Sequence, residues 1–231
     1  MDLASAIVDD RGVAGLSMAA LAEAADYATA SLYTYFPSRA ALVAALQERA
    51  LRVLNQVAED ALVDWDARLA GLPSPGRARS RVEALARLWA FAGLFLTAPE
   101  HHPSEFRLQQ ELLVAANADD ERAAPEVIAA AMAVLDVPRR LVAAAVGAGA
   151  IAADNGVVNR DGAPVDGSMA RTLAWTAAMN GALLLDRLEV GSPVTGAALG
   201  EQVTHALLIG WGADPALVDK AVVAVDGWKE R

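Results

Sequence analysis

The stretch GLSMAALAEAADYATASLYTYFPSR, residues 15–39, decides the fold of the N-terminal region. Ser17 can cap a helix, because its hydroxyl can accept a hydrogen bond from a free backbone N–H in the first turn. The apolar face of that helix is centred on Leu21, and a short break follows around Asp26. A second short helix is expected over residues 28–35. Two short helices joined by so tight a turn predict a helix-turn-helix.

The rest of the chain continues with helical periodicity. Apolar residues recur at helical spacing and strand-like alternation is almost absent, so the sequence predicts an all-α protein. A long connector helix is expected from Ser38 to about Leu69, because the prolines and glycines of residues 71–76 stop it. Residues 156–167 are expected to form a surface loop, with a small hairpin as the alternative. Further helices are predicted at 79–98, 104–118, 125–135, 138–154, 168–189, 197–212 and 214–228.

The composition excludes several classes of protein. The 231 residues contain no cysteine, which excludes disulfides, thiolate metal sites and a cysteine nucleophile. Nineteen Lys and Arg against 29 Asp and Glu give a net charge of −10, so any contact with nucleic acid must be local. The uncharged stretch of residues 141–153 is shorter than the ~20 residues that cross a bilayer. These features, and an N-terminus without a signal-peptide pattern, predict a cytoplasmic protein with no membrane partner.

The end of the quoted stretch resembles a known family. Residues 32–39, LYTYFPSR, are similar to the motif of the tetracycline-repressor (TetR) family of bacterial transcriptional regulators. That motif is a leucine, a tyrosine, any residue, an aromatic and a phenylalanine, followed by a proline or loop residue, a serine and a cation. The resemblance implies a three-helix helix-turn-helix DNA-binding domain over residues 1–54, which includes the start of the connector helix. Residues 55–231 would form a larger helical ligand-binding and dimerisation domain.

The resemblance also implies which side chains meet double-stranded DNA. The helix over residues 28–35 would enter the major groove, and hydroxyl-bearing side chains on it would reach bases and phosphates. Ser17 would place a helix N-terminus against another phosphate, and Arg39 would anchor the far side. The implied DNA-binding residues are Ser17, Thr29, Ser31, Tyr33, Thr34, Tyr35 and Arg39.

The same region carries few cations. Residues 1–54 contain four arginines and six acidic residues, and Asp26 stands where members of the family commonly have glycine. Few neutralised phosphates imply a shallow salt dependence of DNA binding. An alternative hypothesis therefore stays open, in which the chain is a ligand-binding or protein-interaction dimer of the same fold that has lost DNA binding.

The second domain is predicted to bind a small apolar or amphipathic effector. Its helices carry large apolar side chains with polar groups beside them, which is the mixture that an organic ligand needs. For each polar residue, a place on an ordinary surface is the alternative. The predicted ligand-binding residues are Trp89, Phe95, Gln109, Asn117, Thr176 and Asn180.

The helices expected at 168–189 and 197–212 combine small residues with leucines, which lets helices approach closely. The resemblance implies a homodimer through these two helices, with packing inside one chain as the alternative. His101 and His102, ahead of a proline, are interpreted as a loop rather than a metal site, and no cofactor is expected. The whole sequence predicts a non-enzymatic, ligand-responsive regulator, namely a repressor that an effector releases from a palindromic operator.

Overall fold

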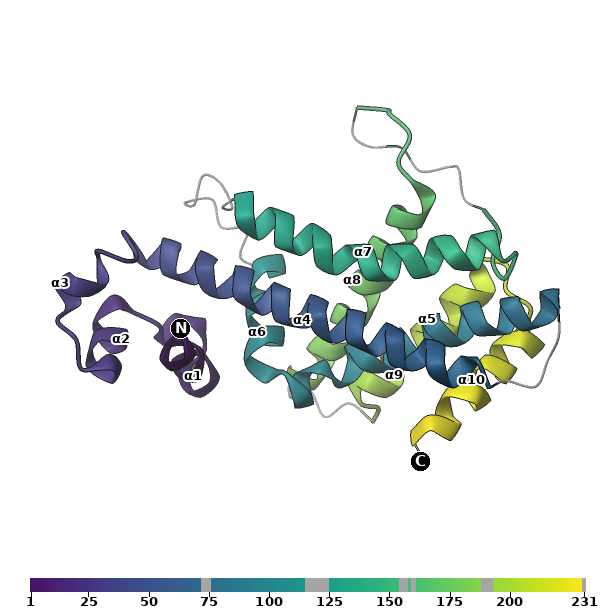
Figure 1. The fold of residues 1–231 in the computed structure, drawn as a ribbon, viewed down its shortest axis with the longest axis horizontal. Helices are drawn as coiled ribbons and strands as arrows, with labels where there is room; N and C mark the ends of the chain where they lie inside the picture. The colour runs from purple at the N-terminus through teal and green to yellow at the C-terminus, as the bar shows by residue number, and fades with distance from the viewer. Residues whose placement is uncertain (72–75, 115–124, 154–157, 159–160, 188–192, 230–231) are drawn as a thin grey trace. The chain divides into compact units, whose positions relative to one another are not determined.

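The computed structural model describes residues 1–71, 76–114, 125–153, 158, 161–187 and 193–229. All of the secondary-structure elements assigned within these ranges are helices, which confirms the predicted all-α class (Figure 1). The helices are α1 (Asp2–Arg11), a 3-10 turn (Val13–Gly15), α2 (Met18–Ala25), α3 (Thr29–Leu32), α4 (Arg39–Leu69), α5 (Arg77–His101), α6 (Pro103–Val114), α7 (Pro125–Gly147), α8 (Gly167–Arg187), α9 (Gly196–Gly210) and α10 (Pro215–Lys229). The loop predicted over 156–167 contains an isolated antiparallel bridge between Val158 and Pro164, which is a single pair of the predicted alternative, a small hairpin.

The second helix of the motif is shorter than predicted. The sequence predicts it over residues 28–35, whereas α3 covers Thr29–Leu32 and the following residues continue as hydrogen-bonded turns. In these turns the Tyr35 N–H donates to the Leu32 carbonyl at 3.0 Å. The Phe36 N–H also donates to the Leu32 carbonyl, at 2.9 Å, so the chain keeps a helical path up to Phe36 in single turns rather than in a continuous helix.

The predicted break before Pro138 is wrong. Instead of two helices, α7 runs unbroken from Pro125 to Gly147 with the proline inside it. A proline removes one backbone hydrogen bond and crowds the preceding turn. Val137 and Val142 beside it are completely buried, and this packing holds the helix together across the missing bond.

The chain packs as two compact units. The first joins Met1–Val57 to Ala98–Val134, and the second joins Ala58–Thr97 to Leu135–Arg231. Nothing in the hydrophobic pattern of residues 98–134 indicates that this segment packs with the N-terminal helices. The sequence-based division after residue 54 stays a prediction about domains.

One apolar cluster holds the first unit together. Leu16, Leu42 and Leu46 are almost completely buried in it, with Leu32 of α3 and Leu108 of α6. Burying a leucine side chain contributes about 1.5–3 kcal/mol relative to leaving it in water. The position of α3 therefore depends on packing against α1, α2 and α4 rather than on its own short helix.

Two arginines tie α1 to later helices of the first unit. The Arg107 Nη1 of α6 donates to the carbonyl oxygens of Val8 at 2.6 Å and Asp9 at 3.0 Å, in the last turns of α1. Cationic donors near a helix C-terminus also interact favourably with the helix dipole. At the other end of α1, Arg49 donates to the Asp2 carboxylate at 2.5 Å and holds the pKa of Asp2 below its ordinary value.

In the second unit, α8 and α9 pack against each other. Gly196 permits this approach, because a Cβ there would lie 2.5 Å from the Ala182 carbonyl oxygen. Between the helices, Trp175 is buried and its indole Nε1 donates to the Thr204 hydroxyl at 2.9 Å. The predicted alternative of packing inside one chain is therefore present for part of each helix, and it leaves other faces of α8 and α9 exposed.

Helix α5 is long and apolar enough to cross a membrane by length and composition. The sequence analysis predicts no membrane-spanning segment and does not single out this helix. Leu85, Leu88 and Phe91 of α5 are buried inside the second unit. A helix that forms part of a core passes the same test of length and composition, so α5 is weak evidence for a membrane segment.

Candidate functional site

The helix-turn-helix is built around Ser17 and Asp26. The Ser17 Oγ accepts a hydrogen bond from the Ala20 N–H at 3.0 Å, so Ser17 caps α2 as its sequence position predicts. At the other end, Asp26 is left-handed with φ 53°, and the Tyr27 N–H donates to the Ala22 carbonyl at 2.9 Å. This is the hydrogen-bond pattern of a Schellman motif, and it turns the chain sharply into α3.

The side chains of α3 and the following turns face solvent. Tyr33 and Tyr35 are 51% and 73% exposed, whereas Leu32 is buried in the core of the unit. Tyrosine combines an apolar ring with a hydroxyl and is typical of binding surfaces. The exposed residues of this segment include all five that the sequence assigns to DNA contact, namely Thr29, Ser31, Tyr33, Thr34 and Tyr35.

Tyr27 belongs to the same region and is missing from the predicted set. It lies in the turn directly before α3 and is 62% exposed. An aromatic residue in a tight turn, outside the apolar periodicity of either helix, is the sequence signal that could have identified it. We add it to the candidate surface, called here the tyrosine face, which comprises Tyr27, Thr29, Ser31, Tyr33, Thr34 and Tyr35.

Arg39 has a structural partner that the sequence did not predict. Its Nε donates to the Leu16 carbonyl and its Nη2 to the Val13 carbonyl, both at 2.6 Å. The guanidinium thus joins the start of α4 to the segment between α1 and α2. A role for Arg39 in anchoring DNA stays a prediction beside this structural one.

The tyrosine face is poor in charge. Residues 12–38 contain only two charged side chains, Glu23 and Asp26, and both are exposed. Arg11, just before this segment, lies 3.1 Å from the carboxylate of Asp10. Contacts with phosphates would therefore depend on hydroxyl groups and backbone N–H groups, which position a protein on DNA with little Coulomb attraction.

The six predicted ligand-binding residues do not line one described cavity. Thr176 is buried and its hydroxyl donates to the Thr172 carbonyl of its own helix, while the Asn180 Nδ2 donates to the Thr176 carbonyl. Phe95 is half-buried with its ring centroid 6.4 Å from that of Phe91. Gln109 belongs to the first unit, and position 117 lies outside the described residues. A ligand role for these five, Phe95, Gln109, Asn117, Thr176 and Asn180, stays a prediction.

Trp89 lines a hollow of about 590 Å³ in the second unit. The hollow lies among α5, α9 and α10, and we call it the Trp89 hollow. Its lining combines apolar and acidic side chains: Trp89, Ala198, Glu201, Gln202, His205, Asp219, Val222 and Val223. Among the predicted ligand-binding residues, Trp89 thus lines a described cavity.

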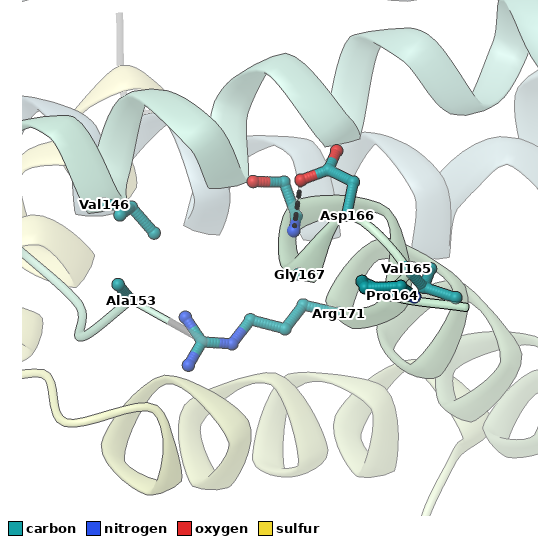
Figure 2. A pocket seen from close by; sticks show the side chains of 8 residues that line it. Val146, Ala153, Pro164, Val165, Asp166, Gly167 and Arg171 are labelled. Atoms are coloured by element: carbon teal, nitrogen blue, oxygen red, sulfur yellow. Dashed lines mark hydrogen bonds between the residues drawn. The ribbon is translucent and has the colours of Figure 1, made fainter. Parts of the chain in front are cut away.

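A second pocket of about 310 Å³ lies at the start of α8 (Figure 2). Asp166 and Arg171 are the charged side chains on its walls. The Asp166 Oδ1 accepts a hydrogen bond from the Ser168 N–H at 3.2 Å, the dashed line in Figure 2. The Arg171 guanidinium donates to the Ala152 carbonyl and lies 5.4 Å from the centre of the Trp211 ring. Both charged side chains thus interact with other groups of the same chain. None of the residues predicted to bind a ligand is among the described residues that line this pocket.

Residues 1–46 match the family model described as bacterial regulatory proteins, tetR family. The matched segment contains α1, α2, α3 and the first part of α4, and therefore the whole tyrosine face. The N-terminal segment of the chain, which carries the helix-turn-helix, therefore matches the tetR family. The resemblance carried by residues 32–39 is thus confirmed for the N-terminal helix-turn-helix segment.

Solved structures share this fold over nearly the whole chain. A protein of unknown function from Rhodococcus sp. RHA1 is 24% identical, with a TM-score of 0.60, over 90% of this chain and 91% of that one. The transcriptional regulator FadR from Bacillus subtilis, solved with stearoyl-CoA, is 12% identical, with a TM-score of 0.59, over 90% and 96%. SmeT, the repressor of the Stenotrophomonas maltophilia multidrug efflux pump SmeDEF, is 14% identical, with a TM-score of 0.57, over 94% and 89%. No curated protein sequence matches the chain significantly.

Proposed function

We propose that this chain is a repressor that binds a palindromic DNA operator through its tyrosine face and leaves it when a small organic effector binds the second unit. The observation that carries the proposal is the exposure of Tyr33 and Tyr35 beside the buried Leu32, inside the segment that matches the family model. Leu32 anchors the segment while the hydroxyl-bearing side chains stay free for a groove of DNA. The proposed protein is a cytoplasmic regulator and not an enzyme.

A homodimer is part of the proposal, because a palindrome presents the same half-site twice. The exposed side of α8 supports it. No charged residue lies between positions 172 and 185, and Leu173 and Leu184 on this helix are 47% and 44% exposed. Ala174, Ala177 and Gly181 are also exposed and are small enough for close helix contact. Together with α9, this side would form a two-fold interface that sets the recognition segments about 34–36 Å apart.

The effector role rests on the fold and on the cavities of the second unit. The structure of FadR is that of a regulator in complex with stearoyl-CoA, and SmeT is a repressor. Helix α4 is one continuous helix that belongs to the first unit up to Val57 and to the second from Ala58. A ligand that favours one arrangement of the second unit would change operator affinity through this helix.

A mobility-shift assay at low salt, with duplex DNA from the region upstream of the coding sequence, tests the proposal. Tyr35→Ala should lower affinity about tenfold, because it removes a ring and a hydroxyl from the proposed interface. Ile128→Ala, which removes an exposed apolar side chain from α7 in the same unit, is the matched control and should leave affinity unchanged.

Failure of the unaltered chain to shift any such DNA would favour the alternative of a ligand-binding dimer without DNA binding. The family match does not favour that alternative. Equal loss of affinity in the Tyr35 and Ile128 variants would show that the tyrosine face is not the interface.

A further inference from the structure

The Trp89 hollow combines an aromatic ring with carboxylates in one cavity. Trp89 comes from α5, Glu201 and His205 lie one helical turn apart on α9, and Asp219 lies on α10. Val222 and Val223 add an apolar wall, and Val223 is 72% exposed. The volume of about 590 Å³ is in the range of sites for small organic molecules.

The two carboxylates of the hollow have no protein counter-charge. Many of the other acidic side chains in the described part of the chain are paired, such as Asp66 with Arg87 at 2.8 Å and Asp136 with Arg139. Glu201 and Asp219, by contrast, make no ion pair or hydrogen bond with any described residue. The described lining contains no lysine or arginine, and Glu201 and Asp219 are its acidic side chains.

We infer that the Trp89 hollow binds a small organic cation with an apolar body, such as an aromatic quaternary ammonium compound. The cationic centre would lie between Glu201, Asp219 and the face of the Trp89 ring. The apolar body would contact Val222 and Val223. Carboxylates attract the charge, and an indole ring is the best aromatic partner for a cation that has little hydration.

Other occupants fit the hollow less well. An anionic ligand would face two carboxylates with no cation in the lining. A metal ion is disfavoured, because no group of three His, Asp or Glu side chains among the described residues is placed to hold one. A second copy of the chain is also disfavoured, because the proposed dimer uses the exposed side of α8, and none of the residues that line the hollow lies on that helix.

The inference deepens the proposed function, since it gives the chemical class of an effector for the second unit. Binding itself does not depend on that function. The Trp89 hollow lies wholly within the second unit, so a cation can bind there whether or not the first unit binds DNA.

The test is a titration of the full-length protein at pH 8 with benzyltrimethylammonium, followed by NMR of the tryptophan indole N–H groups. The chain has five tryptophans, and the Trp89 signal can be assigned from a Trp89→Phe variant. We expect a saturable shift of the Trp89 signal. Benzyl alcohol and phenylacetate, which keep the ring but are neutral or anionic, should bind at least about tenfold more weakly.

Variants separate the role of charge from that of shape. Glu201→Gln and Asp219→Asn should each weaken benzyltrimethylammonium about threefold, and the double variant about tenfold, while thermal unfolding stays unchanged. Glu100→Gln removes an exposed carboxylate outside the hollow and should keep full affinity. The inference is overturned if the Trp89 signal does not move, if phenylacetate binds as well as the cation, or if the double variant keeps full affinity.

A mobility-shift assay with the same cation distinguishes failure of the inference from failure of the proposed function. Binding at Trp89 that leaves a protein–DNA complex intact would support the cation site and contradict its role as an effector site. Binding at Trp89 in a protein that shifts no DNA would support the cation site and contradict the proposed function. Release of DNA without any change at Trp89 would contradict the cation site alone.

Discussion

Some residues of the first unit combine an observed structural contact with a proposed role in DNA binding, and Arg39 is the clearest case. The family motif implies that the cation at the start of α4 contacts DNA. In the structure, two nitrogens of Arg39 donate to the backbone carbonyls of Val13 and Leu16. A sequence motif indicates that a cationic side chain is typical of this position. The motif does not indicate whether that side chain binds a phosphate of DNA or the backbone of the protein itself.

Arg39→Ala should lower the free energy of unfolding by about 1–3 kcal/mol, because two carbonyl acceptors lose a charged donor. Arg39→Lys should recover only part of the loss, since an ammonium group does not reproduce the spread donors of a guanidinium. Urea denaturation followed by circular dichroism measures both. Unchanged stability together with lost operator affinity would instead assign Arg39 to DNA.

Asp26 affects both backbone conformation and charge. Its left-handed conformation is uncommon for a residue with a Cβ, and its exposed carboxylate lies beside the tyrosine face. Asp26→Gly should stabilise the protein by about 0.5–1 kcal/mol and also tighten operator binding. Asp26→Asn is the control, because it removes the charge and keeps a residue that tolerates this conformation. If Asn gives the same gain in operator affinity as Gly, the charge alone is responsible.

At the scale of helices, small residues decide how closely α8 and α9 pack. The small residues of both helices predict close helix packing, either at a subunit interface or inside one chain. The structure shows that each helix has two different faces. Gly196 lies on the face between α8 and α9, whereas Gly181 lies on the exposed side of α8.

Gly196→Ala should destabilise the protein by about 1–3 kcal/mol, because the new methyl group would meet the backbone of α8. Gly93→Ala in α5 is the matched control, since a Cβ there meets no atom within 4 Å. That variant should be neutral or stabilising by up to about 1 kcal/mol. Thermal unfolding of the two variants measures the difference, and equal stabilities would show that α8 and α9 are not closely packed at Gly196.

At the scale of the whole molecule, the proposed dimer joins two identical chains through uncharged helix faces. Leu184→Glu should produce monomers, because it places a charge in the centre of an apolar interface. Val63→Glu, on an exposed position of α4, is the control and should leave the dimer intact. Light scattering coupled to size-exclusion chromatography measures the mass. A Leu184→Glu variant that stays dimeric would place the interface elsewhere.

Features that depend on residues close together in the chain could be predicted from the amino-acid sequence. Helical periodicity gave the all-α class, the position of Ser17 gave the start of α2, and the alternation of Leu32 with tyrosines gave an exposed face over a buried anchor. These features are local, because helix caps and amphipathic faces involve residues within a few positions of one another.

Contacts between segments far apart in the chain could not be predicted and are known from the folded structure. Residues 98–134 join the N-terminal helices, α7 continues through Pro138, and Trp89 lines a hollow together with acidic residues of α9 and α10. Each of these depends on packing between residues far apart in the chain. An apolar pattern shows that a face will be buried but does not specify the partner that buries it, because the hydrophobic effect has no direction.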